Sequence, residues 1–151
     1  MLQDFISDVF IQYAEDCHDL KIEKAHESDC CYDIKTSIDF TIKPNERKLI
    51  PNGFHLSMPN HLEGQVRSRS GLASKKGIFV LNTPGTLDAG YRGEVCTLLF
   101  NTSNETYSFK RGERIAQLKF SFVPKIVLIS VDNINHFSSS RGSNGFGSTG
   151  V

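Results

Sequence analysis

Segment 82–94, NTPGTLDAGYRGE, holds the residues most suited to chemistry in this sequence. Gly85 and Gly90 would let the backbone approach a flat ligand, whose edge the exposed N–H and C=O groups could read. Asp88 could accept a proton from a water molecule as a general base, although an aspartate in such a loop is more often a turn former. The segment therefore indicates either a small-molecule pocket with an acidic catalytic group or an ordinary hairpin turn.

Segment 67–77, RSRSGLASKKG, has residues that could bind phosphate. Ser70 and Gly71 are expected to open one short helix that ends before Gly77. Arg69 would then lie beside the helix N-terminus, where N–H groups and a serine hydroxyl stabilise anionic oxygens. A capped surface turn without a ligand is the alternative.

Two further segments offer polar groups of the same kind. The stretch FKRGERIAQ, residues 109–117, indicates a glycine turn and then a strand start that carries Gly112, Arg114 and Gln117. Residues 141–151, RGSNGFGSTGV, have the composition of a solvated tail. However, Phe146 could stack on a base and Arg141 could bind phosphate. The residues alone leave both interpretations open.

The composition limits the possible partners. The chain has 151 residues, which favours one domain with a sizeable core. Its 17 basic and 17 acidic residues cancel, so we expect neither nucleic acid nor a membrane as a partner. The cysteines lack zinc-finger spacing and predict reduced thiols in the cytoplasm, or in the nucleus if the source is eukaryotic or viral. They are Cys17, Cys30, Cys31 and Cys96.

The amino-terminal residues 1–17 are expected to form an amphipathic helix. Its apolar residues recur at helical spacing and are Leu2, Phe5, Ile6, Val9, Phe10 and Tyr13. The lack of a basic region and the interruption by Asp4 and Asp8 argue against a signal peptide or a membrane span. This helix would cover its own domain or contact a partner or a second subunit.

Beyond residue 33 the apolar period changes from 3.6 to 2. Apolar and polar side chains alternate in 38–42 and 54–58, and turn residues separate the later apolar runs. These runs are GIFVLN, GEVCTLLFN, RIAQLKFSFV and KIVLISV. Many short strands with frequent turns predict an all-β fold, either a jelly roll or a β-barrel.

The order of these segments resembles that of the trimeric dUTP diphosphatase (dUTPase) family, which is known by five short motifs on a β jelly roll. The matching stretches are DCCYDI around Asp33, RSGLA, NTPGTLDAGYRGE, RGERIAQ and the closing RGSNGFGSTG. The resemblance covers residues 20–151. After the helix at 1–17, it implies a jelly-roll core at 18–140 and a mobile arm at 141–151 that closes the active site of a neighbouring subunit.

The resemblance also implies a reaction and a set of site residues. dUTP would be hydrolysed to dUMP and pyrophosphate, with Asp88 activating the water that attacks the α-phosphorus. Uracil and deoxyribose would be bound by Asn82, Gly85, Leu87, Tyr91 and Phe146. Phosphate would be bound by Arg69, Ser70, Gly71, Gln117, Arg141, Ser148 and Thr149. Asp33 would orient water around Mg²⁺, the implied cofactor, which substrate oxygens and water would hold.

The family pattern further implies a homotrimer, and this chain departs from that pattern at a few positions. Cys30 and Cys31 replace small residues, and Ser68, Glu113 and Asn144 replace a proline, an aspartate and a glycine. A dCTP deaminase-type enzyme of the same fold is an alternative, which the LDAGYRGE and GFGSTG stretches disfavour. A non-catalytic, nucleotide-dependent regulatory protein that binds a partner through its amino-terminal helix is the other alternative.

Overall fold

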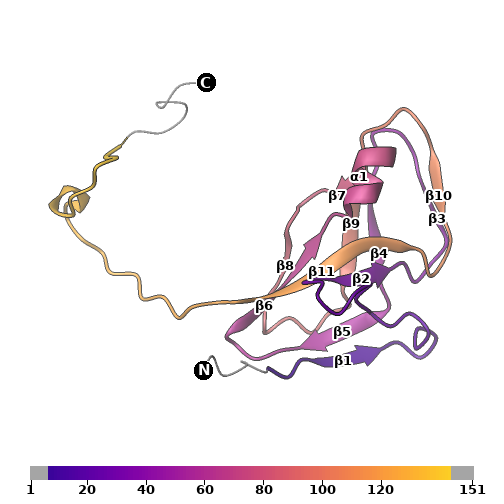
Figure 1. Cartoon of the computed structure of the whole chain (residues 1–151), viewed down its shortest axis with the longest axis horizontal. Coiled ribbons are helices and arrows are strands. Elements are labelled where there is room, and N and C mark those ends of the chain that lie inside the picture. The colour runs from indigo at the N-terminus through magenta and orange to yellow at the C-terminus, as the bar shows by residue number, and fades with distance from the viewer. Residues whose placement is uncertain (1–6, 144–151) are drawn as a thin grey trace.

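The computed structural model describes residues 7–143, and nearly all of the regular structure is β-strand (Figure 1). The strands are β1 (Phe10–Tyr13), β2 (Tyr32–Lys35), β3 (Phe40–Ile42), β4 (Arg47–Pro51), β5 (Phe54–Ser57), β6 (Leu62–Arg67), β7 (Ile78–Val80), β8 (Gly85–Leu87), β9 (Cys96–Asn101), β10 (Tyr107–Phe109) and β11 (Arg114–Phe122). The helices are α1 (Ser70–Lys76) and the 3-10 turn η1 (Ile134–His136). The expected all-β fold is confirmed. Neither helix of this described part has the length and apolar character that a membrane crossing requires.

The body consists of small antiparallel sheets. The largest has the strand order β2-β11-β6-β8, the next has the order β4-β9-β7, and β1-β5 and β10-β3 form pairs. Most neighbours are far apart in the sequence, as jelly-roll connections require. β11 pairs with two strands, so Gln117 lies opposite Asp33 on one side and opposite Arg67 on the other. The central sheet therefore brings polar residues of three distant segments into one row.

The core follows from the alternation of apolar and polar side chains along the strands. In β6, Leu62 and Val66 are buried, whereas Glu63, Gln65 and Arg67 are partly exposed. The same alternation in the other strands fills the space between the sheets. The most deeply buried apolar residues include Ile34, Ile42, Ile50, Phe54, Ile78, Leu99, Ile115 and Leu118.

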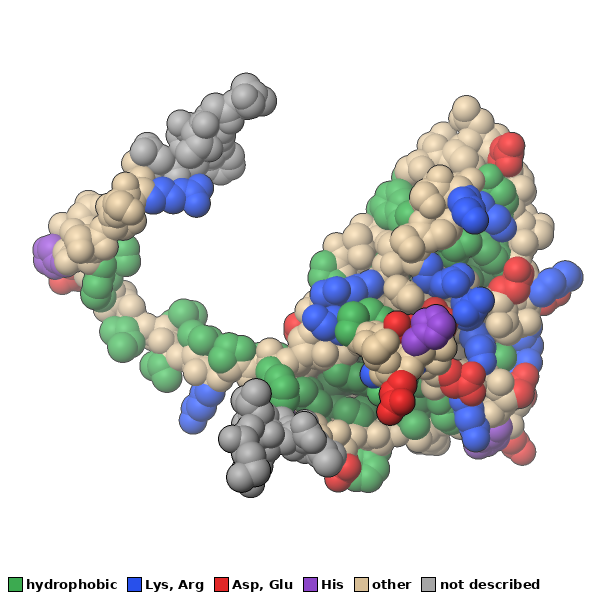
Figure 2. Space-filling model, viewed as in Figure 1, with side chains coloured by type: hydrophobic (Ala, Val, Ile, Leu, Met, Phe, Trp, Pro, Cys, Tyr) green, Lys and Arg blue, Asp and Glu red, His purple; other side chains and the backbone are tan. Residues whose placement is uncertain are grey.

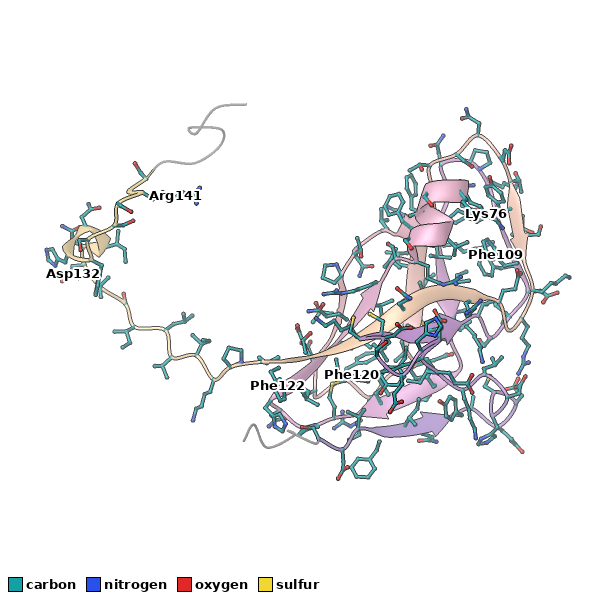
Figure 3. All side chains as sticks on the ribbon, viewed as in Figure 1. Lys76, Phe109, Phe120, Phe122, Asp132 and Arg141 are labelled. Carbon is teal, nitrogen blue, oxygen red and sulfur yellow. The ribbon has the colours of Figure 1, made fainter. Side chains whose placement is uncertain are left out.

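Helix α1 confirms the short helix expected after Arg69. The helix ends at Gly77, whose φ of 64° lies in the left-handed region that glycine adopts without a steric cost. Leu72 is buried against the core. Near the other end, Lys76 Nζ lies 5.1 Å from the centroid of the Phe109 ring on β10 (Figure 3). These contacts fix the helix, and with it the position of Arg69 at its start.

The helix expected at residues 1–17 is wrong over its described part. The chain there forms β1, which pairs with β5. Val9, Ile11 and Tyr13 alternate along the strand and pack against the core. The helical pattern places Phe10 on the buried face, but Phe10 is 70% exposed and Ile11 packs against the core instead, because pairing with β5 sets a period of two. Residues 1–6 lie outside the described residues.

The carboxy-terminal arm begins earlier than expected. β11 ends at Phe122, well before the expected boundary at residue 141. Residues 122–143 are all exposed, and the chain runs away from the body over this range (Figures 1 and 2). The run 125–131, expected to be a core strand, pairs with no strand of the described chain. Leu128 in this run is 92% exposed. The strand expected for this apolar run is therefore wrong over the described chain.

Candidate active site

A pocket of about 330 Å³, here called the loop pocket, opens beside segment 82–94. It brings together five of the predicted residues, which are Asn82, Gly85, Leu87, Asp88 and Tyr91. The remaining lining comes from Leu49, Val66, Val80, Thr86, Glu94, Cys96 and Leu98, none of which was predicted from the sequence. Mostly apolar walls with a few polar groups are typical of small-molecule sites.

One wall of the loop pocket is an edge strand. β8 pairs with β6 on one side, and no other strand of the described chain pairs with its second side. The outer backbone groups of β8 are therefore available to a ligand. A Cβ at Gly85 would lie 3.2 Å from Asn82 Nδ2, so a glycine lets the Asn82 amide lie against the strand. An amide beside free backbone groups can match a flat ligand edge that carries both donors and acceptors.

Tyr91 is held in place by the turn that follows it. Its hydroxyl donates a hydrogen bond to the Glu94 carbonyl at 3.0 Å, and its N–H donates to the Asp88 carbonyl at 2.9 Å. A Cβ at Gly93 would collide with the Tyr91 ring. The Glu94 carboxylate in turn accepts a hydrogen bond from the Gly53 N–H at 2.8 Å. These supporting roles of Gly93 and Glu94 were not predicted from the sequence, although the compact run GYRGE was a usable signal.

Asp88 follows directly after β8 and is exposed at the loop pocket. Within the described part of the chain, no group donates a hydrogen bond to its carboxylate and no basic side chain pairs with it. A carboxylate in this state can bind a water molecule and accept its proton.

The second group of predicted residues surrounds a buried carboxylate. Asp33 on β2 is 8% exposed and lies between two arginines. Arg114 Nη1 donates to Asp33 Oδ2 at 3.1 Å, and Arg69 Nε lies 3.4 Å from Asp33 Oδ1. Arg69 Nη1 also donates to the Arg114 carbonyl at 2.9 Å. These three residues, here called the arginine cluster, carry one net positive charge, which suits an anionic ligand.

The other predicted phosphate-binding residues adjoin the arginine cluster. Gln117 lies opposite Asp33 in the sheet, and Ser70 and Gly71 begin α1 directly after Arg69. A Cβ at Gly71 would meet nothing within 4 Å, so packing inside this chain does not require a glycine there. Arg114 was recognised in the sequence only as a charge at a strand start, and its pairing with Asp33 was missed.

Ion pairs hold the turn that leads into β11. The Arg111 guanidinium donates to both carboxylate oxygens of Asp19 at 2.7 Å, and Lys110 Nζ lies 2.7 Å from Asp39 Oδ2. The hydrogen bonds from Arg111 lower the pKa of Asp19 from 3.8 to about 2. Arg111 thereby connects this turn to the segment after β1, three residues before Arg114.

The loop pocket and the arginine cluster do not meet within the described part of the chain. None of Asp33, Arg69, Ser70 and Gln117 lines the pocket. Arg141 lies near the far end of the described arm, away from the body (Figure 3). Phe146, Ser148 and Thr149 lie outside the described residues. The described residues of one chain therefore do not assemble all the predicted residues into one site.

Asp33 is the residue expected to act near Mg²⁺. The described residues contain no cluster of three or more His, Cys, Asp or Glu side chains that could enclose a metal ion. Asp33 Oδ1 is buried and receives no hydrogen bond, although Arg69 Nε lies 3.4 Å away. This oxygen therefore has unused acceptor capacity, although it is covered in the described structure. The residues fit a contact through water and do not fit a cage of protein ligands.

The sequence is similar to that of known enzymes over most of its length. The dUTPase family profile matches residues 20–150. The deoxyuridine 5'-triphosphate nucleotidohydrolase of Wolbachia pipientis subsp. Culex pipiens is 48% identical over 120 residues, which cover 78% of each chain. The protein of the same name from Clostridium novyi is 45% identical over 128 residues, which cover 85% of this chain and 89% of the relative.

Solved structures show the same architecture. The dUTPase of Staphylococcus bacteriophage 80alpha with dUPNHPP has a TM-score of 0.85 and 27% identity, and the match covers 95% of this chain and 99% of that one. A mutant dUTPase of phage phi11 of S. aureus, described with a coordinated structural Mg(II) ion, has a TM-score of 0.76 and 22% identity. That match covers 84% of this chain and 98% of the phage chain, and it shows the fold alone.

Proposed function

The chain belongs to the dUTPase family, and on that premise we propose that it hydrolyses dUTP to dUMP and pyrophosphate. The observation that carries the proposal is the loop pocket. Among the described residues it combines an edge strand, a tyrosine held by a hydrogen bond and the Asp88 carboxylate, which has no partner there. The reaction would limit uracil incorporation into DNA and supply dUMP for dTMP synthesis.

Uracil is bound by the wall of the loop pocket that β8 forms. Its edge presents a ring N–H between two carbonyl oxygens, which backbone groups of Gly85 and Leu87 and the Asn82 amide can satisfy together. The close approach of Asn82 to Gly85 places the amide beside the strand edge. A cytosine edge has a donor where uracil has an acceptor, so the same groups disfavour dCTP.

Deoxyribose is selected by Tyr91. The hydroxyl of this residue donates a hydrogen bond to the Glu94 carbonyl. Gly93 lies so close to the ring that it limits the space behind it. The ring therefore cannot easily move aside for a larger sugar. A ribose 2'-hydroxyl is rejected by steric overlap, which supports the role that the family resemblance implies for Tyr91.

Asp88 acts as the general base. Its carboxylate binds a water molecule and accepts a proton as the water oxygen bonds to the α-phosphorus. The bond from the α-phosphorus to the bridging oxygen breaks, and the electron pair leaves with pyrophosphate. The support for this role is the exposed, unpaired state of the carboxylate at the pocket.

The triphosphate is bound by Arg69, Ser70, Gly71 and Gln117. In the described structure Arg69 interacts with Asp33, so an entering phosphate competes with that carboxylate for the guanidinium. Arg114 keeps Asp33 paired while Arg69 turns toward the ligand. When bound to the substrate phosphates, Mg²⁺ would neutralise charge on their oxygens, and Asp33 would accept a hydrogen bond from one of its waters.

We further propose that the active enzyme is a homotrimer whose sites are shared between subunits. The separation of the loop pocket from the arginine cluster supports this, because a second chain can bring the two together. The exposed apolar arm gives independent support. Phe122, Ile126, Val127, Leu128 and Ile129 are each more than 60% exposed, and a chain surface of this kind is expected to be covered in an assembly.

Residues 141–151 act as the closing part of the arm. Phe146 would stack on uracil, while Arg141, Ser148 and Thr149 would contact phosphate. Deletion of 141–151 removes none of the described core residues, so the melting temperature should barely change. Turnover should nevertheless fall strongly, because closure positions the triphosphate and excludes bulk water. A truncated protein with full turnover in a pyrophosphate-release assay would show that the arm takes no part.

The reaction is tested by measuring pyrophosphate release from dUTP, dCTP, UTP and the other common nucleotides, with and without Mg²⁺. We expect rapid release from dUTP alone and a strong loss when the metal is chelated. Deamination of dCTP would identify a dCTP deaminase-type enzyme. Nucleotide binding without any release of pyrophosphate would identify a regulatory binding protein.

A further inference from the structure

Two adjacent thiols lie at the entrance to strand β2. The Sγ atoms of Cys30 and Cys31 are 3.5 Å apart, and neither forms a disulfide. Cys30 is exposed and Cys31 is partly exposed. A sulfur–sulfur bond is about 2.05 Å long, so the two atoms need to approach by about 1.5 Å to bond. The thiols are therefore already close to bonding distance.

Cys30 is accessible from a groove of about 440 Å³ at the root of the arm. The groove is also lined by Lys24, Tyr32, Phe120 and Phe122, the last two of which are labelled in Figure 3. A cavity of this volume is large enough for a small molecule. Cys30 is thus the sulfur that a small reagent in the groove would meet first.

The surroundings of the thiol pair carry positive charge. Lys24 lines the groove, and its Nζ lies 5.2 Å from the centroid of the Tyr32 ring. Burial and the neighbouring Cys30 thiol raise the pKa of Cys31, while the charges of Arg67 and Lys119 act in the opposite direction with a smaller effect. Lys24, which lines the groove, favours an anionic reagent there.

The thiol pair is connected directly to the arginine cluster. Cys31 precedes β2, and Asp33 follows two residues later, with its N–H bonded to the Glu23 carbonyl at 2.7 Å. Neighbouring Cα atoms are about 3.8 Å apart across a trans peptide, whereas disulfides usually span about 4.4–6.8 Å. A disulfide between Cys30 and Cys31 would therefore distort the backbone where β2 begins. The distortion would reach Asp33, which holds Arg69 and Arg114.

We propose that Cys30 and Cys31 are a redox-active dithiol that anionic small-molecule disulfides oxidise to an internal disulfide, thereby weakening phosphate binding at the arginine cluster. The effect on catalysis rests on the proposed function, whereas the oxidation itself does not. Strain in the eight-membered ring would make the bond easy to reduce, and strained disulfides of this kind are the labile, regulatory ones.

The oxidation takes place by two thiol–disulfide exchanges. The Cys30 thiolate attacks one sulfur of the reagent disulfide, forms a mixed disulfide and releases the first reagent thiolate. The Cys31 thiolate then attacks the Cys30 sulfur and releases the second reagent thiolate. The two protons lost from the cysteines end on the two released thiols. The protein dithiol is oxidised by two electrons, and the reagent disulfide is reduced by the same two.

The dithiol is tested on the full-length protein with oxidised glutathione as the reagent. Trypsin cleaves after Lys24 and Lys35, so peptide 25–35 contains both thiols and no other cysteine. We expect this peptide to lose two hydrogen atoms, measured by mass spectrometry, and to regain them with dithiothreitol. The variant Cys31→Ser should stop at the glutathione adduct on Cys30. The control Cys17→Ser, which changes a buried cysteine elsewhere, should close the ring as the wild type does.

Activity is measured on the same samples. Ring closure should lower kcat/KM for dUTP by about tenfold or more, since a shift of about 1 Å in positioning groups can cost on the order of 10²-fold. Reduction should restore it. A wild-type peptide that keeps both thiols, or that stops at the adduct, overturns the dithiol site. A closed ring with unchanged kcat/KM overturns the coupling to Asp33. If the reduced protein does not hydrolyse dUTP, the proposed function fails, and the mass measurement still decides the chemistry of the thiols.

Discussion

The loop pocket and the arginine cluster obtain their geometry from different forces. The pocket is shaped by backbone, with an edge strand at β8, a glycine that admits Asn82 and a tyrosine tied to its own turn. The arginine cluster is shaped by charge, because the buried Asp33 carboxylate holds two guanidinium groups. A pocket shaped by the backbone has its form before the ligand binds, so it selects ligands by their shape. A charge-built cluster can exchange one partner for another, which suits transient binding of a triphosphate.

The two regions should differ most strongly in how the kinetic constants respond when the aspartate of each region is replaced. Asp88→Asn keeps a group that can hold water but removes the proton acceptor, so kcat for dUTP should fall by about 10²–10⁴-fold. The matched variant Asp33→Asn removes the charge that positions the arginines, and it should alter KM more than kcat. Steady-state kinetics of pyrophosphate release measure both constants. An Asp88→Asn enzyme with more than about a tenth of wild-type turnover would show that Asp88 is not the base.

The shape selectivity of the loop pocket is tested by removing the Tyr91 ring. Tyr91→Ala should open space for a 2'-hydroxyl and raise kcat/KM for UTP relative to dUTP. The gain should be about 10–200-fold, the range expected for steric discrimination by a small group. Ser70→Ala serves as a control in the phosphate region and should leave the sugar preference unchanged. If Tyr91→Ala discriminates as well as the wild type, another part of the pocket reads the sugar.

The smallest effect that we expect is a change in melting temperature when the ion pair that holds the turn before β11 is removed. Because Arg111 lowers the pKa of Asp19 to about 2, the pair stabilises the fold fully above pH 3.8 and loses that contribution as the pH falls toward 2. The melting temperature of Arg111→Ala should therefore lie slightly below that of the wild type at pH 6. The difference should shrink between pH 4 and pH 2, and a difference that stays constant would mean that Asp19 is not the partner that matters.

Much of the body could be predicted because residues close together in the sequence determine its strands and its helix. Alternating side chains predict the strands around Phe54 and Leu56, and Gly77 marks the end of α1 as expected. The five predicted residues of the loop pocket all fall within segment 82–94, so the sequence brings them close together, although β8 takes its place only by pairing with β6. The pairing of Asp33 with Arg114 could not be predicted, because it depends on the register of β2 against β11.

The two ends of the chain show where local patterns are insufficient. Val9 and Tyr13 fit both a helix and a strand, and only the pairing of β1 with β5 places Ile11 rather than Phe10 on the buried side. The run 125–131 has the apolar composition of a buried strand, yet the described chain provides no partner for it. At the first of these ends the deciding interaction is made with a distant segment, which a local pattern does not reveal.

We expect the loop pocket of one subunit to work together with the arginine cluster of another. This expectation is tested most directly by mixing Asp88→Asn chains with Arg69→Ala chains under conditions that let trimers reassemble. Each parent should be nearly inactive, but about a quarter of the sites in an equal mixture should combine an intact Asp88 with an intact Arg69 from different chains. We therefore expect dUTP hydrolysis to return well above the sum of the two parents. Mixed trimers that form and remain as inactive as their parents would contradict the shared site.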